Sequence, residues 1–172
     1  MEKIAVIYGP EGGYTDEVAH MLAREWGENE TVLLPVSRVN EKDLATFDHL
    51  IFGGPTIGAH NWSHDKGNND WDVFLTRLHK MDLHGKTCAI FGLGDQVSYG
   101  RHFVDDMGVL AEHLKTSGAK LIGQTSPDDY HFEESKALVD GVFVGLPLDH
   151  DNEPEKTLPR LKTWVSLLKK DV

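Results

Sequence analysis

Short apolar runs alternate with amphipathic stretches along almost the whole chain. The runs that predict buried strands are residues 3–8, 31–36, 50–52, 87–91 and 119–123. The stretches that predict helices are residues 15–26, 41–45, 71–79, 103–116 and 159–169. In the first of these, Val18, Met21 and Leu22 follow the i, i+3, i+4 spacing of a helix packed on a sheet. This alternation favours an α/β fold, with a parallel sheet covered by helices on both faces.

Irregular segments follow the carboxyl ends of three predicted strands. They are rich in Gly, Asp and Asn and span residues 9–14, 53–70 and 92–102. In open parallel sheets, ligands bind outside the carboxyl ends of the strands, where the strand order reverses. A fourth irregular segment, residues 124–156, is long for a structureless loop in a compact domain. We therefore expect residues 143–146 to return as the continuation of a split edge strand.

A glycine-rich segment joins the first predicted strand to the first predicted helix. It consists of Gly9, Pro10, Glu11, Gly12, Gly13, Tyr14 and Thr15. Glycines allow successive backbone amides to point inward, and a helix N-terminus adds positive potential, so the segment suits a phosphate group. Thr15 is expected to cap the helix and to offer its hydroxyl to a phosphate oxygen. The glycine spacing matches neither the dinucleotide fingerprint nor the P-loop, so an ordinary turn is an equally good interpretation of this segment alone.

Longer motifs carry a family resemblance that extends through nearly the whole chain. Residues 86–99, Lys-Thr-Cys-Ala-Ile-Phe-Gly-Leu-Gly-Asp-Gln-Val-Ser-Tyr, resemble the flavodoxin strand and loop that cover one face of the flavin. Residues 135–141 and 143–149 are similar to the insertion that marks long-chain flavodoxins. The resemblance implies one flavodoxin-like domain over residues 1–172 and one bound FMN. It also implies a doubly wound five-stranded parallel sheet of order 2-1-3-4-5 in three layers, with an insertion that splits the last strand.

The same resemblance implies which residues flank one face of the flavin. Gly94 and Asp95 would let the backbone approach the edge of the ring, and Tyr99 would stack its phenol on the isoalloxazine. His102 stands where the family often has Asn, and we hypothesise that it tunes the flavin potential with pH. The other positions carried over as cofactor-binding are Leu93, Phe103 and Asp149.

The second flavin-flanking loop implied by the resemblance comprises Pro55, Thr56, Ile57 and Gly58. Ile57 occupies the position where many flavodoxins place Trp. Flavodoxins associated with nitrogen fixation similarly carry an aliphatic residue there and a longer loop afterwards, and this chain has such a stretch at residues 59–69. Trp62, in that stretch, is a candidate to replace the missing aromatic ring. In the family, the carbonyl at the Gly58 position turns to accept a hydrogen bond from the flavin N5–H, and glycine lowers the cost of that rotation.

The phosphate loop departs from the family pattern at Pro10 and Gly12, where flavodoxins usually carry Ser or Thr. Each hydrogen bond lost to a charged group forfeits about 1.5–3 kcal/mol. Pro10 offers no backbone amide, and Glu11 brings a negative charge close to a phosphate dianion. We therefore expect FMN to bind more weakly than is usual in the family.

Composition restricts the partners and the compartment. The 172 residues include 17 Lys or Arg and 28 Asp or Glu, which gives a formal net charge of −11. We interpret the abundant carboxylates as solvated surface groups, which disfavour nucleic acid and anionic lipid and favour redox partner proteins with basic docking surfaces. The apolar runs are too short to span a membrane, and the N-terminus lacks the pattern of a signal peptide. The single cysteine, Cys88, fits a reducing cytoplasm.

No residues suggest a catalytic triad, a pair of catalytic carboxylates or an activated nucleophile. His60 and His64 are four residues apart, but in a predicted loop where this spacing does not make a metal site. This absence suits electron transfer, and the flavodoxin resemblance implies a monomeric low-potential one-electron carrier that shuttles electrons from a reductase donor to an acceptor enzyme. Two alternatives stay open: an FMN-dependent quinone or azo-type reductase, and a flavin-free binding module on the same fold.

Overall fold

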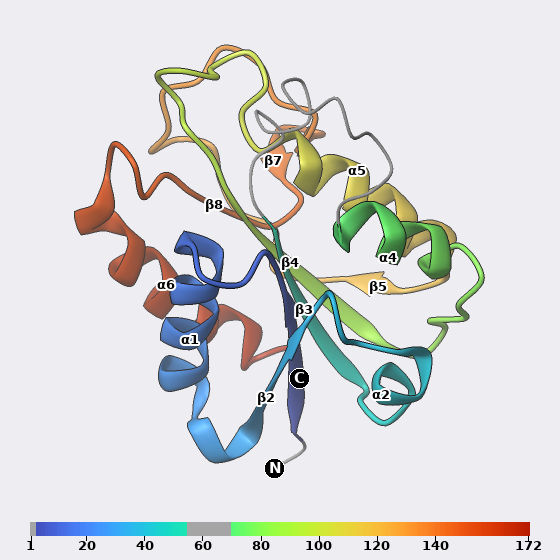
Figure 1. The fold of residues 1–172 in the computed structure, drawn as a ribbon. Coiled ribbons are helices and arrows are strands. Elements are labelled where there is room, and N and C mark those ends of the chain that lie inside the picture. Colours follow the sequence, from blue (N-terminus) through green and yellow to red (C-terminus); the bar gives the residue numbers. More distant parts are fainter. Residues whose placement is uncertain (1–2, 55–69) are drawn as a thin grey trace.

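The computed structural model describes residues 3–54 and 70–172. Strands and helices alternate through most of this part of the chain (Figure 1). The strands are β1 (Ile4–Tyr8), β2 (Thr31–Pro35), β3 (His49–Gly54), β4 (Thr87–Leu93), β5 (Lys120–Leu121), β6 (Leu138–Val139), β7 (Val142–Phe143) and β8 (Leu146–Leu148). The helices are α1 (Tyr14–Trp26), the 3-10 turn η1 (Glu28–Glu30), α2 (Glu41–Ala45), α4 (Asp70–Leu78), α5 (Asp105–Thr116) and α6 (Pro154–Leu168).

Five parallel strands form the sheet in the order β2-β1-β3-β4-β5, which confirms the predicted order 2-1-3-4-5. The last strand is split, as expected. β5 pairs with the start of β4 at Thr87 and Cys88, and β8 pairs with its end at residues 91–93. The returning half begins at Leu146 rather than at Phe143. Phe143 belongs to β7, which pairs antiparallel with β6, and it exchanges two backbone hydrogen bonds with Thr125. Its backbone N–H and carbonyl are therefore bonded within the insertion and not to β4.

Both faces of the sheet are buried beneath helices, which confirms the three layers (Figure 1). Helices α1 and α6 lie side by side on one face, where their apolar residues form a cluster with Val6 and Ile51. Helices α4 and α5, with α2, cover the opposite face, whose cluster includes Ile7 and Phe52. Because consecutive strand residues point to opposite faces, two buried faces require the continuous apolar runs seen in the sequence.

Helix α6 begins at Pro154, earlier than the predicted start at residue 159. Pro154 occupies the first turn, where a proline costs little because its missing N–H has no acceptor within the helix. Pro159 lies inside the helix. The sequence pattern placed the helix start at the second proline, whereas the structure starts it at the first.

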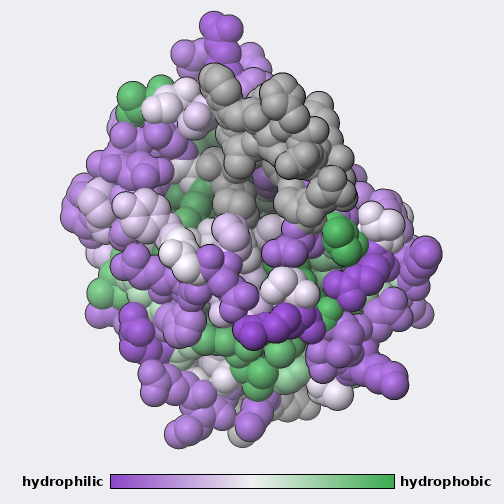
Figure 2. Space-filling model, in the orientation of Figure 1, coloured by the Kyte–Doolittle hydropathy of each residue, from purple (hydrophilic) through white to green (hydrophobic). Residues whose placement is uncertain are grey.

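The visible surface is mainly hydrophilic (Figure 2). A hydrophobic area low in that view lies where Figure 1 draws β2, whose five residues are all half-buried. Within residues 3–54 and 70–172, no helix combines the length and the apolar character needed to cross a membrane.

Candidate cofactor site at the carboxyl ends of the strands

The strand order reverses beside β1, so the carboxyl ends of β1 and β3 lie side by side at the position where ligands bind in open α/β sheets. The Gly9 N–H donates to the Gly53 carbonyl at 3.3 Å, which joins the ends of these two strands. The indole N–H of Trp71, in the first turn of α4, donates to the Gly9 carbonyl at 3.0 Å. These two hydrogen bonds connect the start of the glycine-rich loop to the end of β3 and to the start of α4.

The glycine-rich loop enters α1 through Gly13, which is the N-cap residue. The prediction that Thr15 caps the helix is wrong. Thr15 is already helical and only 3% exposed, whereas capping requires an extended residue just before the first turn. Gly12 has a φ of 85°, which favours glycine, and its N–H donates to the Asp16 carboxylate at 2.8 Å. A Cβ added at Gly12 or Gly13 would meet nothing within 4 Å, so this side of the loop has room for a ligand.

An ion pair at the rim of this loop was missed by the sequence reasoning. Arg38 Nη2 lies 2.9 Å from Glu11 Oε1, so the acidic side chain of the loop carries a cationic partner. The strand pairing could have indicated this ion pair. Because β1 and β2 are parallel, with Tyr8 opposite Pro35, the residues that follow the two strands lie at the same edge of the sheet. Burial, with the nearby carboxylates of Asp16 and Glu11, raises the pKa of the Tyr8 hydroxyl.

Two carboxylates hold the loop after β4 in place. Asp95 Oδ1 accepts the backbone N–H groups of Val97 and Ser98 at 3.0 and 2.8 Å. Although partial burial acts in the opposite direction, hydrogen bonds from Ser98 and Asn152 lower the pKa of Asp95. Asp149 is fully buried, and its Oδ2 accepts the backbone N–H and the side-chain amide of Gln96, both at 3.0 Å. The loop is therefore fixed both from within and from the turn before α6.

The remaining predicted residues of this loop occupy different environments. Tyr99 is half-buried, and its N–H donates to the Asp95 carbonyl at 3.0 Å. His102 is exposed, with Nδ1 at 3.0 Å from Asp105 Oδ2. Phe103 is fully buried, and a Cβ added at Gly94 would lie 2.5 Å from its ring. Its ring packs in an aromatic cluster of the core, so this side chain supports the loop from below instead of lining its surface.

Leu93 ends β4 and is 9% exposed. Tyr14 is half exposed and packs edge-on against His150, with ring centroids 4.6 Å apart. The second predicted loop lies outside the described residues, and its roles therefore stay predictions. The residues concerned are Pro55, Thr56, Ile57, Gly58, His60, Trp62 and His64.

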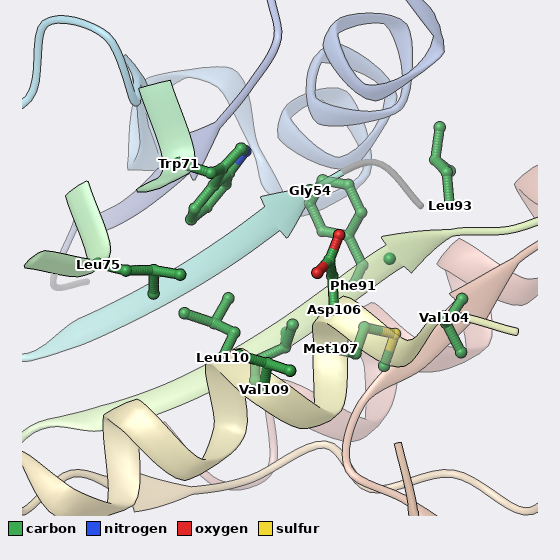
Figure 3. A pocket seen from close by; sticks show the side chains of 12 residues that line it. Gly54, Trp71, Leu75, Phe91, Leu93, Val104, Asp106, Met107, Val109 and Leu110 are labelled. Carbon is green, nitrogen blue, oxygen red and sulfur yellow. The ribbon is translucent and has the colours of Figure 1, made fainter. Parts of the chain in front are cut away.

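A small cavity of about 40 Å³ lies beneath the ends of β3 and β4 (Figure 3). Its lining includes Gly54 and Leu93 from the strand ends, Trp71 from α4, and Asp106 from α5. Burial, with Asp105 and Asp72 nearby, raises the pKa of Asp106 to about 7. The interpretation of the carboxylates as solvated surface groups is wrong for Asp105 and Asp149, which are buried, and for Asp106, which is half-buried.

The described part of the chain was also compared with the requirements of a metal site and of a reactive thiol. No cluster of three or more His, Cys, Asp or Glu side chains there is arranged to hold a metal ion. Cys88 is fully buried, and burial raises the pKa of its thiol to about 12, so it stays protonated and unreactive at neutral pH.

Comparison with known proteins identifies similar chains over nearly the full length. The family model for flavodoxin matches residues 6–164. A flavodoxin of Synechocystis sp. is 40% identical over 170 residues, covering 98% of this chain and 97% of that relative. Flavodoxin 1 of Azotobacter vinelandii is 41% identical over 175 residues, covering 99% and 98%. The structure of the Fusobacterium nucleatum flavodoxin bound to flavin mononucleotide is 27% identical, with a TM-score of 0.88 and 99% coverage of both chains.

Proposed function

The chain belongs to the flavodoxin family, and from this premise we propose that it is a low-potential one-electron carrier with non-covalently bound FMN. The observation that carries the proposal is the site itself. An open glycine loop at a helix N-terminus faces the same edge of the sheet as a loop that two carboxylates hold in place. FMN would supply the redox chemistry, because its ring takes up and releases electrons one at a time.

The glycine-rich loop is the proposed phosphate site. The first four N–H groups of a helix have no acceptor within the helix, and in α1 the first internal bond runs from Glu17 to Gly13. The amides at the start of α1 are therefore available to a phosphate, with Arg38 adding positive charge at the rim. The Gly12 amide is already bonded to Asp16, which supports the expectation of weak FMN binding.

The loop after β4 is the proposed ring site. Tyr99 provides an aromatic face, which stacks favourably on a flat ring by about 0.5–1.5 kcal/mol beyond area burial. Asp95 and Asp149 hold the backbone around Tyr99 in one conformation, so the ring would be bound without first ordering the loop. The residues of the second loop, Pro55 to Gly58, are proposed to flank the opposite face.

The partners are proposed to be redox proteins with basic docking surfaces, a reductase donor and an acceptor enzyme. The net charge of −11 supports this because it attracts basic surfaces and accelerates encounters. A small transient interface suits an electron carrier, which must release each partner quickly. We further propose a monomer in the reducing cytoplasm, in keeping with the single buried cysteine.

Anaerobic potentiometric titration of the FMN-loaded protein tests the proposal. The carrier is expected to accept electrons in two separate one-electron steps and to show no direct oxidation of NAD(P)H. A single two-electron step with NAD(P)H oxidation would indicate the quinone or azo-type reductase instead. A colourless protein that cannot be reconstituted with FMN would indicate a flavin-free binding module.

A further inference from the structure

A cavity of about 370 Å³ lies between helix α6 and the insertion that joins β5 to β8. One wall comes from residues 125–130 of the insertion, and the other comes from α6 between Lys156 and Leu167. The volume falls within the range of about 300–1,000 Å³ that is typical of small-molecule sites. No described residue of the proposed cofactor site lines this cavity, so the two sites are separate.

Much of the cavity lining is apolar or aromatic. Leu146 of β8 and Trp164 of α6 are almost completely buried, whereas Leu167 is 38% exposed. An apolar molecule that covers Leu167 removes apolar surface from water, which favours binding. Tyr130 and Trp164 contribute aromatic rings, and such rings pack favourably against another ring in offset or edge-on geometry. The lining therefore suits a ring compound.

The charged side chains around the cavity are already paired with one another. Arg160 lies 3.0 Å from Glu153 and 3.1 Å from Asp129. Lys156 lies 3.1 Å and 3.3 Å from the same two carboxylates. The Arg160 guanidinium also lies over the Tyr130 ring, 4.2 Å from its centroid. A charged ligand would have to displace one of these partners or stay without a counter-ion, so the arrangement favours an uncharged ligand.

The hydroxyl groups of the cavity differ in what they offer a ligand. Thr125 donates its hydroxyl to the Gly145 carbonyl, and Tyr130 donates its own to a backbone carbonyl at 2.6 Å. Ser126 Oγ instead accepts the Asp128 N–H at 3.2 Å, which leaves the Ser126 O–H to donate. The partner that Ser126 suits is therefore a hydrogen-bond acceptor on the ligand, such as a carbonyl oxygen.

We propose that this cavity binds an uncharged, largely apolar ring compound that carries a carbonyl oxygen. The ring lies against Leu167 and Trp164, and the carbonyl accepts the Ser126 O–H. The ion pairs of Lys156 and Arg160 stay intact, so binding requires no charge to lose its partner. This site is additional to the proposed electron-carrier function and does not depend on it.

NMR titration of the FMN-loaded, ¹⁵N-labelled protein tests the proposal, with 2-acetylnaphthalene as the probe. Bound FMN keeps the probe out of the flavin site. The backbone signals of residues 125–130 and the indole signal of Trp164 should shift and saturate, with a Kd of about 0.1–1 mM for a probe of this size. 2-Naphthoate has nearly the same shape but carries a negative charge, and it should bind at least about threefold more weakly.

Two leucines on α6 provide a matched pair of variants. Leu158 and Leu167 are both 38% exposed, but only Leu167 lines the cavity. Leu167→Asn should weaken probe binding by roughly 3–10-fold, because the probe then covers a polar side chain. Leu158→Asn should bind the probe as wild type does.

The contribution of the Ser126 hydroxyl is measured with a second probe. Ser126→Ala should weaken binding of 2-acetylnaphthalene by roughly 2–10-fold, because the carbonyl loses its donor. The same variant should bind 2-ethylnaphthalene, which has no carbonyl, as tightly as wild type does.

Intermolecular NOEs between the probe and Leu167 or Trp164 of the wild-type protein locate the site without any variant. Their observation would support the proposal. Shifts that do not saturate, equal probe affinity in Leu167→Asn and Leu158→Asn, or tighter binding of 2-naphthoate would overturn it. None of these outcomes bears on the proposed electron-carrier function, which the potentiometric titration tests separately.

Discussion

Arg38 and Glu11 form an ion pair at the rim of the proposed phosphate site, with 70% of the Arg38 side chain and 46% of the Glu11 side chain exposed. An exposed pair of this kind contributes only about 0–1 kcal/mol to folding. At the proposed phosphate site, Arg38 would attract the phosphate and screen its repulsion from Glu11. This attraction would partly offset the absence of hydroxyl groups at Pro10 and Gly12.

Arg38→Gln should weaken FMN binding by roughly 3–10-fold, because the phosphate then faces an uncompensated Glu11. Riboflavin, which has no phosphate, should bind equally to wild type and variant. Fluorescence quenching titrations of the apoprotein with both flavins measure the difference. Arg24→Gln, an exposed arginine in the last turn of α1, is the control. An equal loss of affinity for riboflavin would show that Arg38 acts on the fold and not on the phosphate.

Asp106 makes folding depend on pH. Its folded-state pKa is raised from 3.8 to about 7, so between these values the folded protein binds more protons than the unfolded chain. Wild-type stability therefore falls as the pH rises through this window, by roughly 2–4 kcal/mol in total. The Asp106→Asn variant lacks this pH-dependent contribution to stability. The free energy of unfolding of the variant, relative to that of wild type, should therefore increase from about pH 4 to about pH 8.

Urea unfolding of the two apoproteins at a series of pH values measures this dependence. Because the comparison uses apoprotein, it is independent of flavin binding. A stability difference that does not change with pH would show that Asp106 already ionises at its ordinary pKa in the folded protein.

At the scale of elements, the turn before α6 supports the loop after β4. Asp149 follows directly after β8, which is the returning half of the split strand, and its buried carboxylate accepts both N–H groups of Gln96. Asn152, two residues before α6, donates to Asp95 at 2.8 Å. Although the insertion lengthens the chain between β5 and β8, the residues that follow β8 still contact the loop after β4.

Asp149→Ala should destabilise the protein by about 2–4 kcal/mol, because it leaves the buried N–H groups of Gln96 without their acceptor. It should also weaken FMN binding, since the loop that carries Tyr99 would no longer be held in one conformation. Thermal unfolding and flavin titration measure the two effects. Asp128→Ala, an exposed carboxylate in the insertion, should change neither property by more than about 0.5 kcal/mol. Unchanged FMN affinity in Asp149→Ala would exclude a role in positioning the loop.

At the scale of the whole molecule, the net charge of −11 is expected to accelerate encounters with the proposed basic partners. Electron transfer to a basic c-type haem protein should slow by roughly tenfold when the salt concentration rises from about 10 mM to about 500 mM. Reduction by an uncharged small molecule should respond far less to salt. Stopped-flow absorbance measures both rates. An equal salt dependence for the two reactions would argue against electrostatic attraction of the protein partner.

The sequence by itself determined the fold class, because apolar runs buried on both faces with amphipathic stretches between them indicate a parallel sheet covered by helices. The length of residues 124–156 indicated the split edge strand. The strand order was implied by the resemblance to flavodoxins, not by the hydrophobic pattern. The sequence also identified the glycine-rich loop and residues 92–99, because a backbone that turns sharply or approaches a ligand closely requires particular residues. These are local constraints, and local constraints can be read along the chain.

Only the tertiary structure decided which charges face each other. Arg38 meets Glu11 because β1 and β2 pair in parallel, and Asp149 meets Gln96 because β8 returns beside β4. Asp106 looks like any acidic residue at the start of a helix, and its environment depends on how α4, α5 and the strand ends enclose a cavity. Burial and the distances between charges set its pKa, and both arise from residues far apart in the sequence.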